Sequence, residues 1–113
     1  MTPETIVQQQ VEAYNTRNLA AFADCFAEDI QLFNFQQLQP YLSGKQALRE
    51  AYGDVFGNSP DLHATIVQRI VLGNKVIDHE QVVGRKGVDF IDVVVVYEVE
   101  NGLINRVTYI RKT

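Results

Sequence analysis

The sequence predicts an α+β domain in which helices come first and a meander of antiparallel strands comes last. Apolar residues recur at helical spacing in the first half of the chain. Residues with β-branched side chains dominate the second half and include four consecutive valines at positions 93–96. A chain of 113 residues can bury one hydrophobic core but not two. We therefore expect residues 1–113 to form a single domain.

Three helices are expected before residue 60. The first begins at residues 2–4 (Thr-Pro-Glu), which supply a hydroxyl cap, a proline for the first turn and an acid near the positive end of the helix dipole. Asn18 can cap a second, short helix, and Ser43 followed by Gln46 has the capping-box spacing for a third. Residues 57–60 (Gly-Asn-Ser-Pro) end the third helix.

The first expected strand covers residues 30–35, between the second and third helices, and has Asn34 on its inner face. Two further strands, at about 63–72 and 76–84, follow the third helix and are joined by a tight turn at residues 73–74. Apart from this first strand, the strands follow the helices along the chain, as in an α+β fold.

The turn at residues 73–74 sets how its two strands pair. If the loop has two residues, Arg69 lies opposite Asp78 and Val67 lies opposite Glu80. Strand alternation sends Asp78 and Glu80 to one face and His79 to the other. These three side chains therefore cannot form one compact site.

The last two strands form a hairpin around residues 100–102 (Glu-Asn-Gly). A three-residue loop pairs Val95 with Val107, whereas a two-residue loop pairs Val94 with Tyr109. We favour the three-residue loop because Asn-Gly preceded by glutamate suits it. This register places Val95, Val107 and Tyr109 on the inner face of the sheet.

Composition and charge argue against several classes of partner. The formal net charge is −4 and no basic stripe is present, so we expect no nucleic-acid partner. No apolar run approaches the ~20 residues of a membrane span, so we expect no membrane partner. The N-terminus lacks the features of a signal peptide, which favours a cytoplasmic location.

Metal-ligand spacing is absent from the sequence. Cys25 is the only cysteine, so it cannot form an internal disulfide, and a buried structural role is the simpler interpretation. His63 and His79 show none of the close His spacings of metal sites. We expect no metal and no cofactor.

The order helix, helix, strand, helix and meander resembles the nuclear transport factor 2-like superfamily, which includes ketosteroid isomerases and SnoaL-like polyketide cyclases. Residues 26–29 (Phe-Ala-Glu-Asp) and 99–104 (Val-Glu-Asn-Gly-Leu-Ile) carry part of the resemblance, which covers nearly the whole chain. It implies a cone-shaped, strongly curved, mostly antiparallel sheet wrapped around three N-terminal helices. It also implies a pocket for a small apolar molecule in the mouth of the cone and a homodimer through the outer sheet face.

Ketosteroid isomerases use a carboxylate base, a tyrosine donor and a protonated aspartate donor. The resemblance places these roles on Asn34, Gln10 and Val95, so the family's three ionisable catalytic residues are missing, and asparagine cannot take a proton at neutral pH. A supporting tyrosine of the family does match, at Tyr52. We therefore do not expect ketosteroid isomerisation by that mechanism.

Other residues could carry chemistry in the expected pocket. Glu80 and Asp78 are candidate catalytic residues, because a partly desolvated carboxyl group near Arg69 or Arg111 can act as general acid or base. The alternative is structural: an Arg69–Asp78 cross-strand pair and a Glu80 hydrogen-bonded to a tyrosine. The candidate ligand-binding residues are Tyr14, Phe22, Phe26, Asn34, Tyr52, Val95, Val107, Tyr109 and Arg111.

Three functions are compatible with these residues. The first is a small-molecule enzyme that uses acid–base chemistry for isomerisation, dehydration, cyclisation or epoxide opening. The second is a domain that binds or senses a ligand without turnover. The third is an interaction module that uses the outer face around Val94 and Val96, where His79 and Asp92 are also expected.

Overall fold

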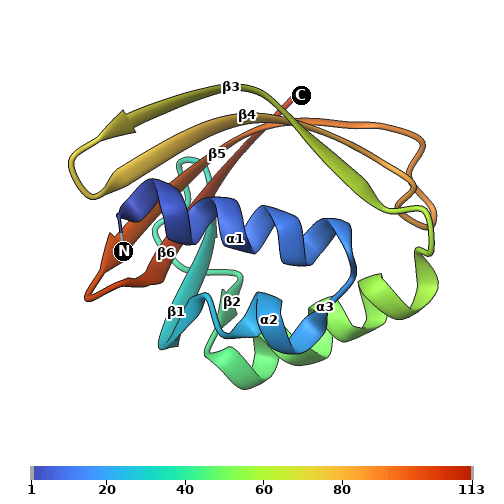
Figure 1. The fold of residues 1–113 in the computed structure, drawn as a ribbon, viewed down its shortest axis with the longest axis horizontal. Coiled ribbons are helices and arrows are strands. Elements are labelled where there is room, and N and C mark those ends of the chain that lie inside the picture. Colours follow the sequence, from blue (N-terminus) through green and yellow to red (C-terminus); the bar gives the residue numbers. More distant parts are fainter. Residues whose placement is uncertain (1, 113) are drawn as a thin grey trace.

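The computed structural model describes residues 2–112 and contains three helices and six strands (Figure 1). The helices are α1 (Pro3–Asn15), α2 (Leu19–Ala23) and α3 (Lys45–Asn58). The strands are β1 (Phe26–Asn34), β2 (Leu42–Ser43), β3 (His63–Leu72), β4 (Lys75–Val83), β5 (Ile91–Glu100) and β6 (Leu103–Arg111).

All six strands belong to one sheet with the order β2-β1-β6-β5-β4-β3. Neighbouring strands are antiparallel except β1 and β6, which are parallel. The sheet is strongly curved and arches over α1, with α2 and α3 beneath that helix (Figure 1). The predicted α+β architecture, a curved and mostly antiparallel sheet around N-terminal helices, is confirmed.

Two of the three predicted helix starts are confirmed. The Thr2 side chain accepts a hydrogen bond from the Thr5 amide at 3.1 Å, and the Asn18 side chain accepts one from the Ala21 amide at 3.1 Å. The predicted capping box at Ser43 is wrong, because Ser43 belongs to β2 and the third helix starts after Gly44 without a side-chain cap.

The predicted pairing of β3 with β4 is confirmed near the turn and wrong farther from it. Arg69 lies opposite Asp78, as expected. Beyond that pair a β-bulge changes the register, so Ile66 and not Val67 lies opposite Glu80. The extra residue on β3 leaves Val67 without a direct partner on β4.

The predicted register of the last hairpin is also wrong, because a bulge separates two registers. Glu100 pairs with Leu103 across a two-residue loop, but past the bulge Val95 pairs with Tyr109. The shift from the expected Val95–Val107 pair is two residues, so the same side chains still face inward. Val95 and Val107 are both buried.

The core lies between the concave face of the sheet and the helices. A cluster of aromatic rings forms part of this core: the Phe22 ring centroid is 4.9 Å from that of Phe26 and 4.8 Å from that of Tyr52. Tyr52 of this cluster also lines a cavity between α1, α3 and the sheet. No helix within residues 2–112 has the length and apolar character needed to cross a membrane.

Candidate functional site

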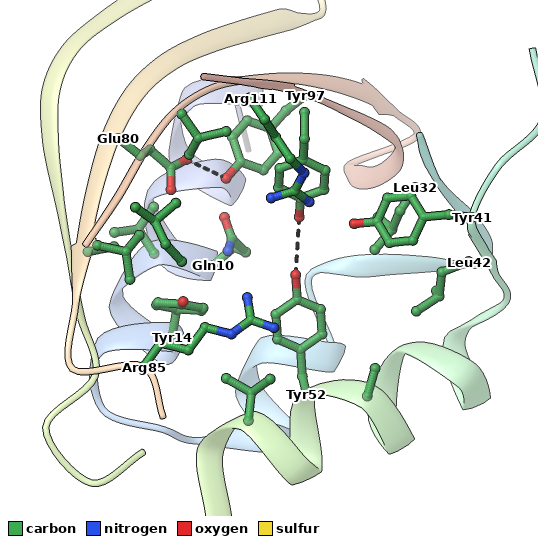
Figure 2. Close-up of a pocket in the computed structure, with 18 residues that line it drawn as sticks. Gln10, Tyr14, Leu32, Tyr41, Leu42, Tyr52, Glu80, Arg85, Tyr97 and Arg111 are labelled. Atoms are coloured by element: carbon green, nitrogen blue, oxygen red, sulfur yellow. Dashed lines mark hydrogen bonds between the residues drawn. The ribbon is translucent and has the colours of Figure 1, made fainter. Parts of the chain in front are cut away.

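A cavity of about 200 Å³ opens between α1, α3 and the inner face of β4, β5 and β6 (Figure 2). Its apolar wall includes Val11, Leu32, Val55, Ile91 and Val93. A cavity of ~150 Å³ with such a lining can hold a benzene ring. The space therefore suits one ring with substituents that extend toward the mouth.

Glu80 on β4 is the acidic residue of the cavity wall and is only 8% exposed. The Tyr97 hydroxyl on β5 donates a 2.7 Å hydrogen bond to Glu80 Oε2 (Figure 2). Tyr97 is the side-chain hydrogen-bond partner of Glu80 within residues 2–112, and its bond goes to Oε2 and not to Oε1. Burial raises the Glu80 pKa from 4.5 to about 7; the Tyr97 hydrogen bond opposes this rise, and the negative charge of Asp78 adds to it.

Asp78 lies on the same face of β4 but does not reach the cavity. It is fully buried and accepts two hydrogen bonds from Arg69, at 2.7 Å from Nε and 2.9 Å from Nη2. Arg69 also donates to Gln8 of α1 at 2.9 Å, so the pair joins the sheet to the helix. Both contacts of the structural interpretation are therefore present: Asp78 forms an ion pair with Arg69, and Glu80 is hydrogen-bonded to a tyrosine.

Tyrosine hydroxyls provide most of the remaining polar surface. The hydroxyl oxygens of Tyr52 and Tyr109 are 3.1 Å apart and share one hydrogen bond, so one hydroxyl hydrogen of the pair stays available to a ligand. Burial raises the pKa values of Tyr14, Tyr52 and Tyr109, and it raises the pKa of Tyr41 to about 12. These hydroxyls therefore stay protonated at neutral pH and can donate hydrogen bonds.

Two arginines complete the cavity lining, and Figure 2 shows both guanidinium groups directed into the space beside Tyr14, Tyr52 and Tyr97. Arg111 Nε donates a 3.0 Å hydrogen bond to Asn34 Oδ1. Its guanidinium carbon lies 5.0 Å from the centroid of the Tyr109 ring, within range of a cation–π contact.

Arg85 follows a glycine that holds its loop against the chain before β3. Gly84 has φ +81°, and a Cβ atom there would overlap the Asp61 carbonyl oxygen. The Lys86 amide donates to the buried Ser59 hydroxyl at 3.1 Å on the other side of Arg85. The backbone on both sides of Arg85 is therefore fixed to the body of the protein.

Gln10 of α1 contributes a buried amide to the cavity wall. Its side chain is 6% exposed, and Oε1 lacks a hydrogen-bond partner within residues 2–112. A buried amide oxygen without a partner costs free energy, so a ligand or water that reaches the amide would be stabilised there.

The structure brings some of the candidate residues together and separates others. Glu80, Tyr14, Tyr52, Tyr109 and Arg111 line the cavity. Asn34 lies behind Arg111 and holds it, outside the lining. The remaining candidates are buried in the core behind the wall: Phe22, Phe26, Val95 and Val107.

Tyr41, Arg85 and Tyr97 also line the cavity but were not predicted from the sequence. Alternation from Val93 along β5 could have indicated that Tyr97 faces inward. No local pattern indicated the other two, because both belong to segments outside the long strands.

The outer face carries the two remaining polar candidates. His79 Nε2 and Asp92 Oδ1 are 2.6 Å apart there, away from the cavity lining. Within residues 2–112, no three His, Cys, Asp or Glu side chains lie close enough together to hold a metal ion.

Known proteins share this architecture. A cystatin-fold protein from Novosphingobium aromaticivorans is 25% identical, over 98% of this chain and 99% of that chain, with a TM-score of 0.89. A candidate ketosteroid isomerase from Kribbella flavida is 20% identical over 98% of this chain and 78% of that chain, with a TM-score of 0.82. A candidate polyketide cyclase from Sinorhizobium meliloti is 18% identical over 93% of each chain, with a TM-score of 0.77.

No curated protein sequence matches the chain. The family model described as the SnoaL-like domain matches residues 7–107, which run from α1 to β6 and include most of the cavity wall. The chain therefore belongs to the SnoaL-like family within the nuclear transport factor 2-like superfamily.

Proposed function

We propose that this chain is a small-molecule enzyme in which Glu80 transfers a proton to or from a ligand in the cavity. The observation that carries the proposal is a buried carboxyl group with a pKa of about 7 at the wall of a cavity lined by apolar side chains, tyrosines and two arginines. A group whose pKa lies near the working pH is present in both protonation states, so it can act as base or acid. Isomerisation, dehydration and cyclisation all need such a proton transfer.

The neighbours of Glu80 have complementary roles in this proposal. Tyr97 holds Glu80 Oε2, which leaves Oε1 to approach the substrate. The Tyr52–Tyr109 pair keeps one hydroxyl hydrogen that can donate to a substrate oxygen as negative charge develops on it. A carbonyl compound with an acidic C–H bond would use both groups: Glu80 would take the proton, and the tyrosine pair would stabilise the enolate.

The alternative is a ligand-binding domain without turnover. It is favoured by Gln10, Asn34 and Val95, which occupy the positions where ketosteroid isomerases carry their ionisable groups. A cavity lined by apolar side chains and hydrogen-bond donors can bind a ligand without any proton transfer.

A base-catalysed ring opening separates these functions without knowledge of the natural substrate. In 5-nitrobenzisoxazole a base removes the C3 proton, the electron pair forms the nitrile, and the N–O bond breaks to release a coloured phenolate. We expect the rate to rise with pH with an apparent pKa of about 7 and to be lost in Glu80→Gln.

Glu50→Gln is the matched control, since Glu50 is an exposed residue of α3 outside the cavity. Equal rates in the wild type and Glu80→Gln would contradict the proposal. If, in addition, ligands bind in the cavity and Glu80 titrates near 4.5 in a carboxyl-carbon NMR titration, the binding domain is the correct function.

A further inference from the structure

We propose that the ligand of this cavity is a small monocyclic carboxylate whose anionic group lies between Arg85 and Arg111. This inference rests on the proposed function, because it names the substrate class of the same cavity. It is carried by the charge of the cavity lining, the partners of the two arginines, the contacts that place them beside the cavity and the size of the cavity.

The cavity lining is cationic in an acidic protein. Its formally charged residues are Glu80, Arg85 and Arg111, which sum to +1 when Glu80 is ionised and to +2 when it is protonated. The whole chain carries a formal net charge of −4. The cavity lining is therefore positive although the whole chain is negative, which favours an anionic ligand.

Unlike Arg69 and Arg106, these two arginines have no carboxylate partner within residues 2–112. Arg69 pairs with Asp78, and Arg106 lies 3.5 Å from Glu98. Arg111 instead donates to the neutral amide of Asn34, and Arg85 forms no ion pair or hydrogen bond through its side chain within residues 2–112. Their charges are available to a ligand.

Neutral contacts hold the Arg111 guanidinium group, and the backbone that carries Arg85 is held by its neighbours. Arg111 is fixed by Asn34 and by the Tyr109 ring, and the backbone around Arg85 is fixed by the close approach of Gly84 to Asp61. Both guanidinium groups lower the pKa of Tyr52 against the larger effect of burial, which places them near the same hydroxyl. A planar carboxylate can accept two hydrogen bonds from each such group.

The size and polarity of the cavity set the orientation of the ligand. About 200 Å³ accommodates a single ring. An anionic group would be repelled by ionised Glu80, so it is placed at the arginines and the opposite edge of the ring faces Glu80 and Gln10. The reacting position of the substrate is therefore on the part of the molecule farther from its carboxylate.

The test compares benzoate with benzamide, which has the same shape without the charge, by NMR titration of the protein amides at constant ionic strength. We expect benzoate to shift resonances of residues around the cavity and to bind ~10-fold or more tightly than benzamide, as hydrogen bonds to charged groups usually do. Benzylamine, a cation of similar size, should bind more weakly than either.

Three variants assign the preference to its residues. The double variant Arg85→Gln/Arg111→Gln should bind benzoate and benzamide alike. Arg49→Gln on α3 removes one exposed positive charge outside the cavity and should keep the wild-type preference. Glu80→Gln removes the negative charge that repels the anion, so it should strengthen the preference for benzoate. Circular dichroism would verify that each variant is folded.

The inference is overturned if benzamide binds as well as benzoate, if benzoate leaves the cavity resonances unchanged, or if the double variant keeps the preference. These outcomes are distinct from failure of the proposed function. A benzoate preference without any Glu80-dependent ring opening would remove the enzyme and keep the ligand class. Ring opening without a benzoate preference would keep the enzyme and remove the ligand class.

Discussion

Replacement of Glu80 by glutamine should change how the stability of the protein depends on pH. Glutamine keeps the size of the side chain and an oxygen that can accept the Tyr97 hydrogen bond, but it has no proton to lose. The wild-type carboxyl is almost completely buried, so its ionisation in the folded state is costly. The substitution removes that cost and little else.

The raised pKa sets both the sign and the size of the effect. The folded state binds the Glu80 proton more tightly than the unfolded state, with a pKa of about 7 against 4.5. Stability from the protonated carboxyl is therefore fully present below the unfolded value and is lost as pH rises through the folded value. At ~1.4 kcal/mol per pKa unit, this shift corresponds to about 3 kcal/mol lost between about pH 4 and pH 8.

Urea denaturation of the wild type and Glu80→Gln across this pH range measures the effect directly. The difference in unfolding free energy between the two proteins cancels the contributions of the other ionisable groups, which both proteins share. We expect the variant to gain about 3 kcal/mol relative to the wild type as pH rises. Parallel curves would show that Glu80 ionises without a burial cost, and the reasoning about its pKa would be refuted.

Three further predictions concern the surroundings of the cavity. Asp78→Asn should destabilise the fold by about 3 kcal/mol, because it leaves Arg69 partly buried without its counter-charge, and urea denaturation measures this loss. The same substitution removes a negative charge near Glu80, so it should lower the pKa of Glu80, which carboxyl-carbon NMR measures. Gly84→Ala should lower the unfolding free energy by at least ~3 kcal/mol, whereas Gly87→Ala, at a similar φ of +83° but in open space, should cost about 1 kcal/mol; equal losses would mean that the contact with Asp61 is unimportant. We also propose that the outer sheet face forms a homodimer, since four residues lie in one row across β3 to β6: Ile70, Ile77, Val96 and Thr108. Analytical ultracentrifugation should show a dimer that the Val96→Lys substitution dissociates. A monomeric wild type would refute this proposal.

Much of the fold could be predicted because its elements carry local patterns. Thr2 and Asn18 have side chains that can cap a helix, so they predicted the two helix starts, and the valines at 93–96 predicted a buried strand. The registers could not be predicted fully, because bulges depend on how the sheet curves around the helices. The inward residues were still predicted, since a shift of two residues preserves the face.

The candidate site was less predictable because its geometry comes from contacts between distant segments. The loop that carries Arg85 to the cavity wall is held where Gly84 packs against Asp61, more than twenty residues earlier in the chain. A pair of basic residues in a loop gives no indication of such a contact. Positions of this kind are set by tertiary packing and have no signature in the local sequence.

Asp78 and Glu80 show how partners reached through tertiary structure decide the role of a carboxylate. Both lie on the inner face of β4, and the sequence offered each as a candidate base. Asp78 meets the Arg69 guanidinium directly across the strand pair, which binds both of its oxygens and keeps it out of the cavity. Glu80 meets the neutral hydroxyl of Tyr97, although the register pairs Tyr97 with Val76, so this hydrogen bond runs diagonally along the sheet. Asp78 is held by two hydrogen bonds from a cation outside the cavity lining, whereas Glu80 lines the cavity beside a neutral hydroxyl and burial raises its pKa, and this difference in partner makes Glu80 the candidate for proton transfer.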